Sequence, residues 1–397
     1  MTKILATIDW YLPGFKAGGP VRTVSNLVEL LREDFEFFIV TRDRDLHDTQ
    51  PYPSLPLGTW TKIGAAQVYY SGNLSLRSLR RRIAEIAPDI IYLNSFFSRI
   101  SIRILLLRWL RLIPRCAVVL APRGEFSQGA RSIKRRRKWL YMKVALPFLY
   151  RQVLWQASTE QEAEQIKRAL AGKGDKPRGK VALARNVIHV APDVPGMLHG
   201  SPANVRLRKE PGSARIVFLA RISRMKNPRT AIELSCGLRG DITFDIYGPL
   251  EDPALWAECQ DAMKQAPANV KISYRGPVAP DRVQAILGQY HLFVLPTLGE
   301  NFGHVILEAL GAGCPVVISD QTPWSQLQEK GVGWTLPLDH LSGWRQALQS
   351  CVDMENTAFT EMSERARRFA REFVELPGTR EEYIDLFTHA ISLTERT

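Results

Sequence analysis

The sequence contains few cysteines, and they form no recognisable pattern. No two of them make a CxxC pair, and no histidine lies at the spacing of a metal-ligand set. Their number is odd and their positions are widely scattered, which argues against a disulfide framework. We therefore expect free thiols in a reducing compartment. The five are Cys116, Cys236, Cys259, Cys314 and Cys351.

The sequence also lacks a long uncharged apolar run. No such run approaches the ~20 residues that a helix needs to span a bilayer. The amino-terminal segment before Asp9 has one lysine and too few apolar residues for the hydrophobic region of a signal peptide. We therefore expect a cytoplasmic protein with no spanning helix.

Acidic residues are scarce in the first half of the chain. Residues 1–200 carry 32 basic and 16 acidic side chains, whereas the remainder carries 21 and 24. Most of the excess lies between residues 77 and 151, where 18 basic residues face only Glu85, Asp89 and Glu125. One part of the protein is therefore strongly basic, and the other is not.

Strand-like and helix-like segments alternate along the chain. Short apolar runs such as KILATID, DIIYLN and CAVVLAP are each followed by a segment with helical spacing. The pattern restarts after residue 213 with ARIVFLA, ITFDIYG and HLFVLPT. Because 397 residues are enough for two domains, we predict an α/β protein of two doubly wound Rossmann-like domains facing across a cleft.

The domain boundaries follow from the composition. The segment GSPANVRLRKEPGS, residues 200–213, has the proline and glycine content of a linker and no apolar periodicity. It separates a domain at residues 1–199 from a second domain at residues 214–372. A last helix, residues 373–397, is predicted to pack back on the first domain.

Two glutamates lie eight positions apart in GENFGHVILEAL, residues 299–310. The preceding run HLFVLPT is predicted to be a buried parallel strand, so Glu300 lies in the loop at its carboxyl end, where open α/β sheets bind ligands. A helix is expected to start near Phe302 or Gly303. Its periodicity places Val305 on the apolar face and His304 with Glu308 on the opposite face. Glu308 should therefore look towards a cleft between the domains.

The start of this helix suits a phosphate. Backbone N–H groups at His304 and Val305 and the positive end of the helix dipole favour an anion. Carboxylates on either side can accept hydrogen bonds from hydroxyl groups. A phosphate flanked by two such carboxylates describes a nucleotide diphosphate sugar, such as a UDP- or GDP-sugar. The donor-binding loop and helix start comprise Asn301, Phe302, Gly303, His304 and Val305.

Several motifs, in order, resemble those of glycosyltransferase family 4, the retaining group 1 enzymes of the GT-B fold. They are PGFKAGGPVRT after the first strand, PRGEF at 122–126, FLARISRMKNP at 218–228, DIYGP, the E-x7-E helix and GAGCPVVIS. The resemblance covers most of the chain. It implies transfer of a hexose-type sugar with retention of the anomeric configuration, without a cofactor. Positive charge from Arg221, Lys226 and the helix start makes a divalent ion unnecessary, so we expect a metal-independent reaction.

The resemblance also implies roles for single residues. Arg221 and Lys226 correspond to the clamp on the donor diphosphate. Glu300 corresponds to the residue that holds hydroxyls of the donor sugar, and Glu308 to the one that holds the ribose. These are the expected catalytic and donor-binding side chains. The glycines assigned to the donor site with them are Gly18, Gly19 and Gly248.

The acceptor side is less defined. Many members of the wider family carry a histidine after the strand that corresponds to DIIYL, but this sequence has Asn94 or Ser95 there. Arg123 in PRGEF is either an acceptor contact or a salt-bridge partner of Glu125. The DRD at 43–45 superficially matches the metal-binding DxD of the GT-A fold. We interpret it as a solvated loop and expect no metal.

The basic stretch bears on the acceptor. RSIKRRRKWLYMK, residues 131–143, holds seven cations with Trp139 and Tyr141, and IRILLLRWLRLIPR adds four arginines among leucines. Such segments suit an anionic membrane surface, although nucleic acid would use the same charge and a solvated helix remains an alternative. The cations assigned to the acceptor or membrane side are Lys134, Arg135, Arg136, Arg137 and Lys138.

The sequence therefore predicts a cytoplasmic glycosyltransferase, peripheral at the inner face of the cell membrane, that extends a lipid-linked saccharide in surface polysaccharide synthesis. A soluble enzyme with a small-molecule acceptor is the first alternative. The second is a nucleic-acid-binding protein that uses the basic stretch at residues 77–151.

Overall fold

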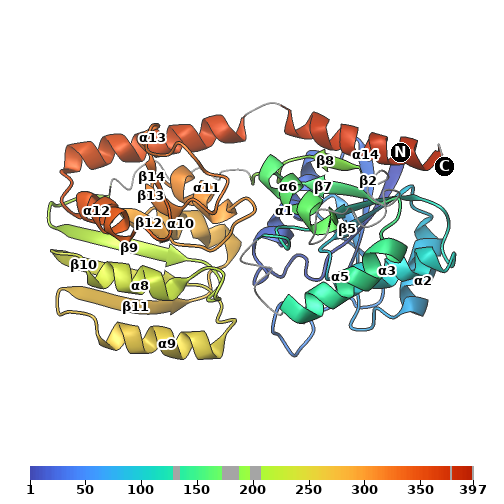
Figure 1. Ribbon diagram of the computed structural model, residues 1–397, viewed down its shortest axis with the longest axis horizontal. Coiled ribbons are helices and arrows are strands. Elements are labelled where there is room, and N and C mark those ends of the chain that lie inside the picture. Colours follow the sequence, from blue (N-terminus) through green and yellow to red (C-terminus); the bar gives the residue numbers. More distant parts are fainter. Residues whose placement is uncertain (128–134, 172–186, 197–206, 376–377, 396–397) are drawn as a thin grey trace. The chain divides into compact units, whose positions relative to one another are not determined.

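The computed structural model describes residues 1–127, 135–171, 187–196, 207–375 and 378–395, with the backbone alone for residues 135–140. The chain divides into two compact units (Figure 1). Unit 1 consists of Met1–Val194 and Pro377–Thr397, and unit 2 of Pro195–Leu376. Part of the expected linker, residues 200–206, lies outside the described residues.

Unit 1 is built on an eight-stranded sheet with the strand order β3-β4-β2-β1-β5-β6-β7-β8. Only the pairing of β3 with β4 is antiparallel among the pairings of this sheet. β5 and β6 are buried along their whole length because helices cover both faces of a parallel sheet. The strands are β1 (Thr2–Thr7), β2 (Phe35–Thr41), β3 (Trp60–Ile63), β4 (Ala66–Tyr70), β5 (Ile90–Asn94), β6 (Ala117–Ala121), β7 (Leu154–Ala157) and β8 (Ile188–Val190).

Helices alternate with most strands of unit 1, whereas β2, β3 and β4 follow one another along the chain. α2 and α3 each begin at a serine, Ser75 and Ser98, whose hydroxyl accepts a hydrogen bond from a backbone N–H of the first turn. The helices are α1 (Gly19–Leu30), α2 (Leu76–Ile86), α3 (Arg99–Trp109), α5 (Arg135–Leu149), α6 (Glu160–Ala171) and α14 (Thr379–Glu395).

The last helix of the chain packs in the core of unit 1. Tyr383, Leu386 and Phe387 of α14 are buried in the same cluster as residues of β1, β5 and β6. The helix begins at Thr379 rather than at residue 373. The preceding helix, α13, continues through Val374 because Phe373 packs on Trp324, with ring centroids 4.8 Å apart.

Unit 2 is built on a six-stranded parallel sheet with the order β11-β10-β9-β12-β13-β14. The strands are β9 (Ser213–Leu219), β10 (Asp241–Tyr247), β11 (Val270–Gly276), β12 (Leu292–Leu295), β13 (Val316–Ser319) and β14 (Gly333–Leu336). The helices are α8 (Pro228–Cys236), α9 (Pro253–Lys264), the 3-10 turn η1 (Pro280–Arg282), α10 (Val283–Leu287), α11 (His304–Gly311), α12 (Leu341–Val352) and α13 (Asn356–Val374).

The prediction of two doubly wound α/β domains is confirmed. Each unit has its own buried core around a parallel sheet. The five cysteines are free, and four of them are buried. No helix in the described part of the chain is long and apolar enough to cross a membrane.

A buried histidine joins the start of unit 2 to its central strands. His291, directly before β12, is 4% exposed. Its Nδ1 accepts a hydrogen bond from the Arg215 N–H at 2.9 Å, and its Nε2 lies 3.1 Å from the carbonyl oxygen of Arg208. These partners require a neutral ring with its proton on Nε2, because a proton on Nδ1 would face the Arg215 N–H. Burial lowers the pKa of His291 to about 4.

We predict that His291 makes folding less favourable as the pH falls from about 6.5 towards 4. In this window the unfolded histidine, with a pKa of ~6.5, binds a proton that the folded ring does not, so the proton favours unfolding. For a pKa of about 4 in the folded protein, the contribution of His291 to the free energy of unfolding falls by about 2 kcal/mol between pH 7 and pH 5. Urea unfolding of wild type and His291→Gln at both pH values measures it. If the free energy of unfolding of His291→Gln falls as much between pH 7 and pH 5 as that of the wild type, His291 is not the group responsible.

Candidate functional site

The strand order of unit 2 reverses beside β9. β9 has β10 on one side and β12 on the other, so the loops that leave the carboxyl ends of β9 and β12 are neighbours. Two hydrogen bonds join the loop after β12 to the loop after β9. The Leu298 N–H and the Thr297 hydroxyl donate to the Met225 carbonyl at 2.8 and 3.0 Å. Ligands of open α/β sheets bind at such a switch point.

Lys226 and Glu300 meet at this point. The Nζ of Lys226 donates to a carboxylate oxygen of Glu300, and the side chains are 13% and 16% exposed. The Glu300 N–H donates to the Gln321 carbonyl at 2.9 Å, which fixes the loop after β12 to the loop after β13. Two of the predicted catalytic residues, 74 positions apart, therefore form one ion pair with limited access to solvent.

Arg221, the third predicted catalytic residue, follows β9. Its Nη1 donates to a carboxylate oxygen of Glu251 at 2.9 Å, and both side chains are about one-third exposed. Gly248, at the end of β10, has φ 140°, and a Cβ there would lie 1.8 Å from the carbonyl oxygen of Ala220. Gly248 therefore permits the close approach of two backbones directly before Arg221.

α11 begins where the sequence places a helix, but its first side chain points elsewhere. Gly303 caps the helix with φ 85°, which favours glycine. His304 is buried, and its ring centroid is 4.8 Å from that of Phe302. The expected exposed face shared by His304 and Glu308 is therefore wrong, because a side chain in the first turn points back towards the helix start. Val305 and Glu308 are half-buried.

Phe302 contributes its side chain to the core of unit 2. Its ring contacts Trp324 and Phe373 at centroid distances of 5.5 and 6.0 Å, and the Trp324 indole N–H donates to its carbonyl. Trp324 is buried as well. This aromatic packing holds the backbone of the loop from Glu300 to Gly303, while Asn301 is half-exposed.

The glycine loop of unit 1 leads into α1, with Gly18 at φ 75° as the capping residue and Gly19 as the first helical residue. Asp45 holds this loop, since its carboxylate accepts the N–H groups of Phe15 at 2.8 Å and Lys16 at 3.1 Å. The interpretation of the DRD as a solvated loop is wrong, because Asp43 and Asp45 are only 5% and 4% exposed. Among the described residues, no group of three or more His, Cys, Asp or Glu could hold a metal ion.

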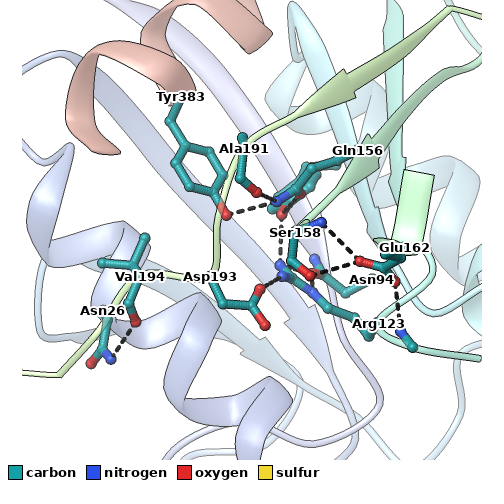
Figure 2. A network of polar contacts seen from close by, with 12 residues as sticks. Asn26, Asn94, Arg123, Gln156, Ser158, Glu162, Ala191, Asp193, Val194 and Tyr383 are labelled. Atoms are coloured by element: carbon teal, nitrogen blue, oxygen red, sulfur yellow. Dashed lines mark hydrogen bonds and ion pairs between the residues drawn. The ribbon is translucent and has the colours of Figure 1, made fainter. Parts of the chain in front are cut away.

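Arg123 lies in the interior of unit 1 (Figure 2). Its guanidinium pairs with Asp193 and donates to the Asn94 side-chain oxygen at 2.8 and 3.1 Å and to the Tyr92 hydroxyl at 2.6 Å. Asn94 is 2% exposed. Arg123 and Asn94, which we assigned to the acceptor side, therefore bond one another inside unit 1. Asp193 is a partner that sequence reasoning missed.

The same network fixes the PRGEF loop from its other side. The buried carboxylate of Glu162 accepts the Gly124 N–H at 2.7 Å and both the N–H and the hydroxyl of Ser158 at 2.8 Å. Burial raises the pKa of Glu162, and the backbone donors oppose that rise. Figure 2 shows that Gln156 links the network to Tyr383 of α14, at 2.7 Å. In the sequence, Glu162 looks like an ordinary acid in the first turn of a helix.

The predicted basic cluster is only partly described. Lys134 lies outside the described residues. The backbone of Arg135, Arg136, Arg137 and Lys138 forms the first turn of α5.

Part of the chain resembles known glycosyltransferases in sequence. Residues 204–369 match a model of the family described as "Glycosyl transferases group 1". A stretch of 149 residues is 29% identical to D-inositol 3-phosphate glycosyltransferase of Paenarthrobacter aurescens and covers 36% of each protein. The chain thus spans about a third of the length of this curated relative.

Solved structures resemble the whole chain. Sucrose-phosphate synthase from Thermosynechococcus elongatus gives a TM-score of 0.70 at 14% identity, over 99% of this chain and 100% of that one. WaaG, a glycosyltransferase involved in lipopolysaccharide biosynthesis, gives 0.64 at 13% identity, over 97% and 99%. The predicted GT-B fold is confirmed. The match to the group 1 glycosyltransferase model lies at residues 204–369, most of which belong to unit 2.

Proposed function

We propose that the protein is a retaining glycosyltransferase that moves a hexose-type sugar from a nucleotide diphosphate sugar to a saccharide acceptor. The observation that carries this proposal is the contact of Lys226 with Glu300 at the switch point of a group 1 glycosyltransferase domain. A cation suits a diphosphate, and a neighbouring carboxylate suits sugar hydroxyls. Membership of family 4 and a UDP- or GDP-sugar as donor belong to the same proposal.

The charges explain how this site would bind a donor. Arg221 and Lys226 each contact a carboxylate, Glu251 and Glu300 respectively. Phosphate oxygens bind such cations with strong, charge-assisted hydrogen bonds and therefore compete with the carboxylates. Once Lys226 binds phosphate, Glu300 can accept hydroxyls of the donor sugar. Glu308, on α11, is proposed to accept the ribose hydroxyls.

The same cations would lower the barrier of the reaction. As the anomeric C–O bond to the diphosphate breaks, negative charge grows on the phosphate, where Arg221, Lys226 and the start of α11 stabilise it. The acceptor oxygen forms its bond on the same face of the sugar, and its proton passes to the leaving phosphate oxygen. The positive charge comes from side chains and backbone, so the reaction is proposed to be metal-independent.

The acceptor is proposed to be a lipid-linked saccharide of surface polysaccharide synthesis, at the inner face of the cell membrane. The basic excess in residues 77–151 and the fold shared with WaaG, whose name places it in lipopolysaccharide biosynthesis, support this choice. A small-molecule acceptor is the second candidate. The names of the inositol-phosphate and sucrose-phosphate relatives favour it.

We predict that Arg221→Ala or Lys226→Ala lowers kcat/KM about 10²-fold or more, because each change removes a cation from a developing phosphate charge. The melting temperature of Arg221→Ala should change little, because Arg221 and Glu251 are about one-third exposed. Lys226→Ala leaves the mostly buried Glu300 without its cation and should melt lower, so the rates are compared at a temperature at which both variants are folded. Sugar transfer from the donor that a thermal-shift screen identifies is the measurement. Arg224→Ala is the control, since Arg224 lies in the same loop and pairs with Asp252 and Glu258 instead. Equal activity of all three variants would contradict the assignment of Arg221 and Lys226 to the donor diphosphate.

The two glutamates should separate in a binding assay. Glu308→Gln is expected to weaken binding of the free nucleotide, because the ribose loses a charged acceptor. Glu300→Gln should bind the free nucleotide at least as tightly as wild type, because Lys226 is no longer held by a carboxylate, and should lower the rate of sugar transfer. Isothermal titration with UDP and GDP, followed by transfer assays, checks both. A similar loss of nucleotide affinity in the two variants is the outcome that contradicts these roles.

Chelation should leave the rate unchanged. Arg221, Lys226 and the start of α11 supply the positive charge in the proposed mechanism, so EDTA has nothing essential to remove. The assay compares initial rates with EDTA, with added magnesium and with added manganese. Loss of activity in EDTA that either metal restores would require a metal site and would reopen the question of Asp43 and Asp45.

A further inference from the structure

Large apolar side chains gather on one part of unit 1. Among the described residues, eleven large hydrophobic side chains are exposed, and five of them lie at the end of α3 and on α5. They are Trp109, Leu110, Leu112, Val144 and Phe148, with exposed fractions of 41% to 60%. Single exposed apolar residues are common, but such a cluster marks an interaction site.

On α5 the exposed residues recur with helical spacing. Lys143, Val144, Pro147 and Phe148 are exposed, at positions i, i+1, i+4 and i+5, and Arg151 is exposed two residues beyond the helix. The opposite side is packed into the core of unit 1 through Ala145, Leu146, Leu149 and Tyr150. α5 therefore presents an apolar stripe with a cation near each end.

The end of α3 lies against the end of α5. Arg108 donates from its Nη1 to the Arg151 carbonyl at 2.8 Å and from its Nη2 to the Gln152 carbonyl at 3.0 Å. Figure 1 shows the two helices next to one another. Trp109 directly follows Arg108, and Phe148 lies one helical turn before Arg151. The two exposed segments thus form one region, which we name the α3–α5 surface.

The α3–α5 surface is basic as well as apolar. Arg111, Arg115, Lys143 and Arg151 are exposed in it. Within the described residues 99–127 and 141–151 the only acidic residue is Glu125, whose carboxylate accepts the Phe96 N–H at 2.6 Å and the Ser95 hydroxyl at 2.7 Å. The local potential is therefore positive.

We propose that the α3–α5 surface docks on an anionic lipid bilayer. Trp109, Leu110, Leu112, Val144 and Phe148 enter the boundary between headgroups and acyl chains, and the arginines and lysine contact lipid phosphates. Tryptophan is favoured at that boundary. The inference rests on the proposed membrane-side acceptor and adds the residues that contact the lipid.

The chemistry of the α3–α5 surface favours lipid over other partners. A second copy of a chain with net charge +13 would bring two basic surfaces together. Nucleic acid would use the cations and the two aromatic rings, but the aliphatic Leu110, Leu112 and Val144 offer no ring on which a base can stack. An anionic bilayer uses the cations, the aromatic rings and the aliphatic side chains together.

Co-sedimentation with vesicles tests the proposal. The full chain should bind phosphatidylcholine vesicles that contain phosphatidylglycerol, less well at high salt, and bind pure phosphatidylcholine weakly. The vesicle affinity of the double variant Trp109→Ser/Phe148→Ser should fall at least about tenfold, because the variant removes two large apolar groups from the interface. A second variant, Leu112→Ser/Val144→Ser, should behave similarly. The matched control Leu57→Ser/Leu341→Ser removes two exposed leucines outside the α3–α5 surface and should bind as wild type does.

Several outcomes would overturn the proposal. The wild type could fail to bind anionic vesicles at low salt, or it could bind single-stranded RNA but no vesicles. The wild type could also form a dimer that the double variant Trp109→Ser/Phe148→Ser dissociates. In parallel, the rise in melting temperature that nucleotide sugars cause is measured for the same proteins. Donor protection without vesicle binding refutes only the α3–α5 surface. Vesicle binding without donor protection leaves that surface and refutes the proposed transferase.

Discussion

The ion pair of Lys226 with Glu300 connects the elements on which the candidate site depends. It can form because a parallel sheet brings the carboxyl ends of its strands to one edge and because the strand order of unit 2 reverses beside β9. The Met225 carbonyl, which accepts two hydrogen bonds from the loop after β12, keeps the loops in register. Without that reversal the two side chains would leave the sheet at separate places.

The two units fix their loops by different means. In unit 1, carboxylates accept backbone N–H groups from the loops that follow three neighbouring strands. Asp45 holds the loop after β1, Glu125 the loop after β5 and Glu162 the loop after β6. These hydrogen bonds involve no cation that a bound phosphate could take over. In unit 2 the carboxylates Glu251 and Glu300 bind cations instead, and a phosphate can take over such a cation.

Sequence reasoning found the strands and the loop that carries Glu300, and it missed most contacts between distant residues and one local packing contact. The apolar runs predicted the strands, and the loop after HLFVLPT placed Glu300 correctly, because both depend on neighbouring residues. The partners of Arg123 and Arg221 were not predicted, since Asp193 and Glu251 lie 70 and 30 positions away. The burial of His304 was missed because periodicity alone ignores how a first-turn side chain points back onto Phe302. The DRD was misread because the carboxylate of Asp45 accepts hydrogen bonds from the distant glycine loop.

In the proposed function, the pairing of Lys226 with Glu300 also links the recognition of phosphate to the recognition of sugar. A nucleotide that takes Lys226 leaves the carboxylate of Glu300 with less compensation in a site where both side chains are mostly buried. Inorganic phosphate or a bare nucleotide offers no group to replace that contact. A nucleotide sugar offers hydroxyl donors at the same place, so the cost of separating the pair is offset only by the complete donor. The preference for the nucleotide sugar over the free nucleotide product then follows from one ion pair, and no second group is needed to disfavour the product.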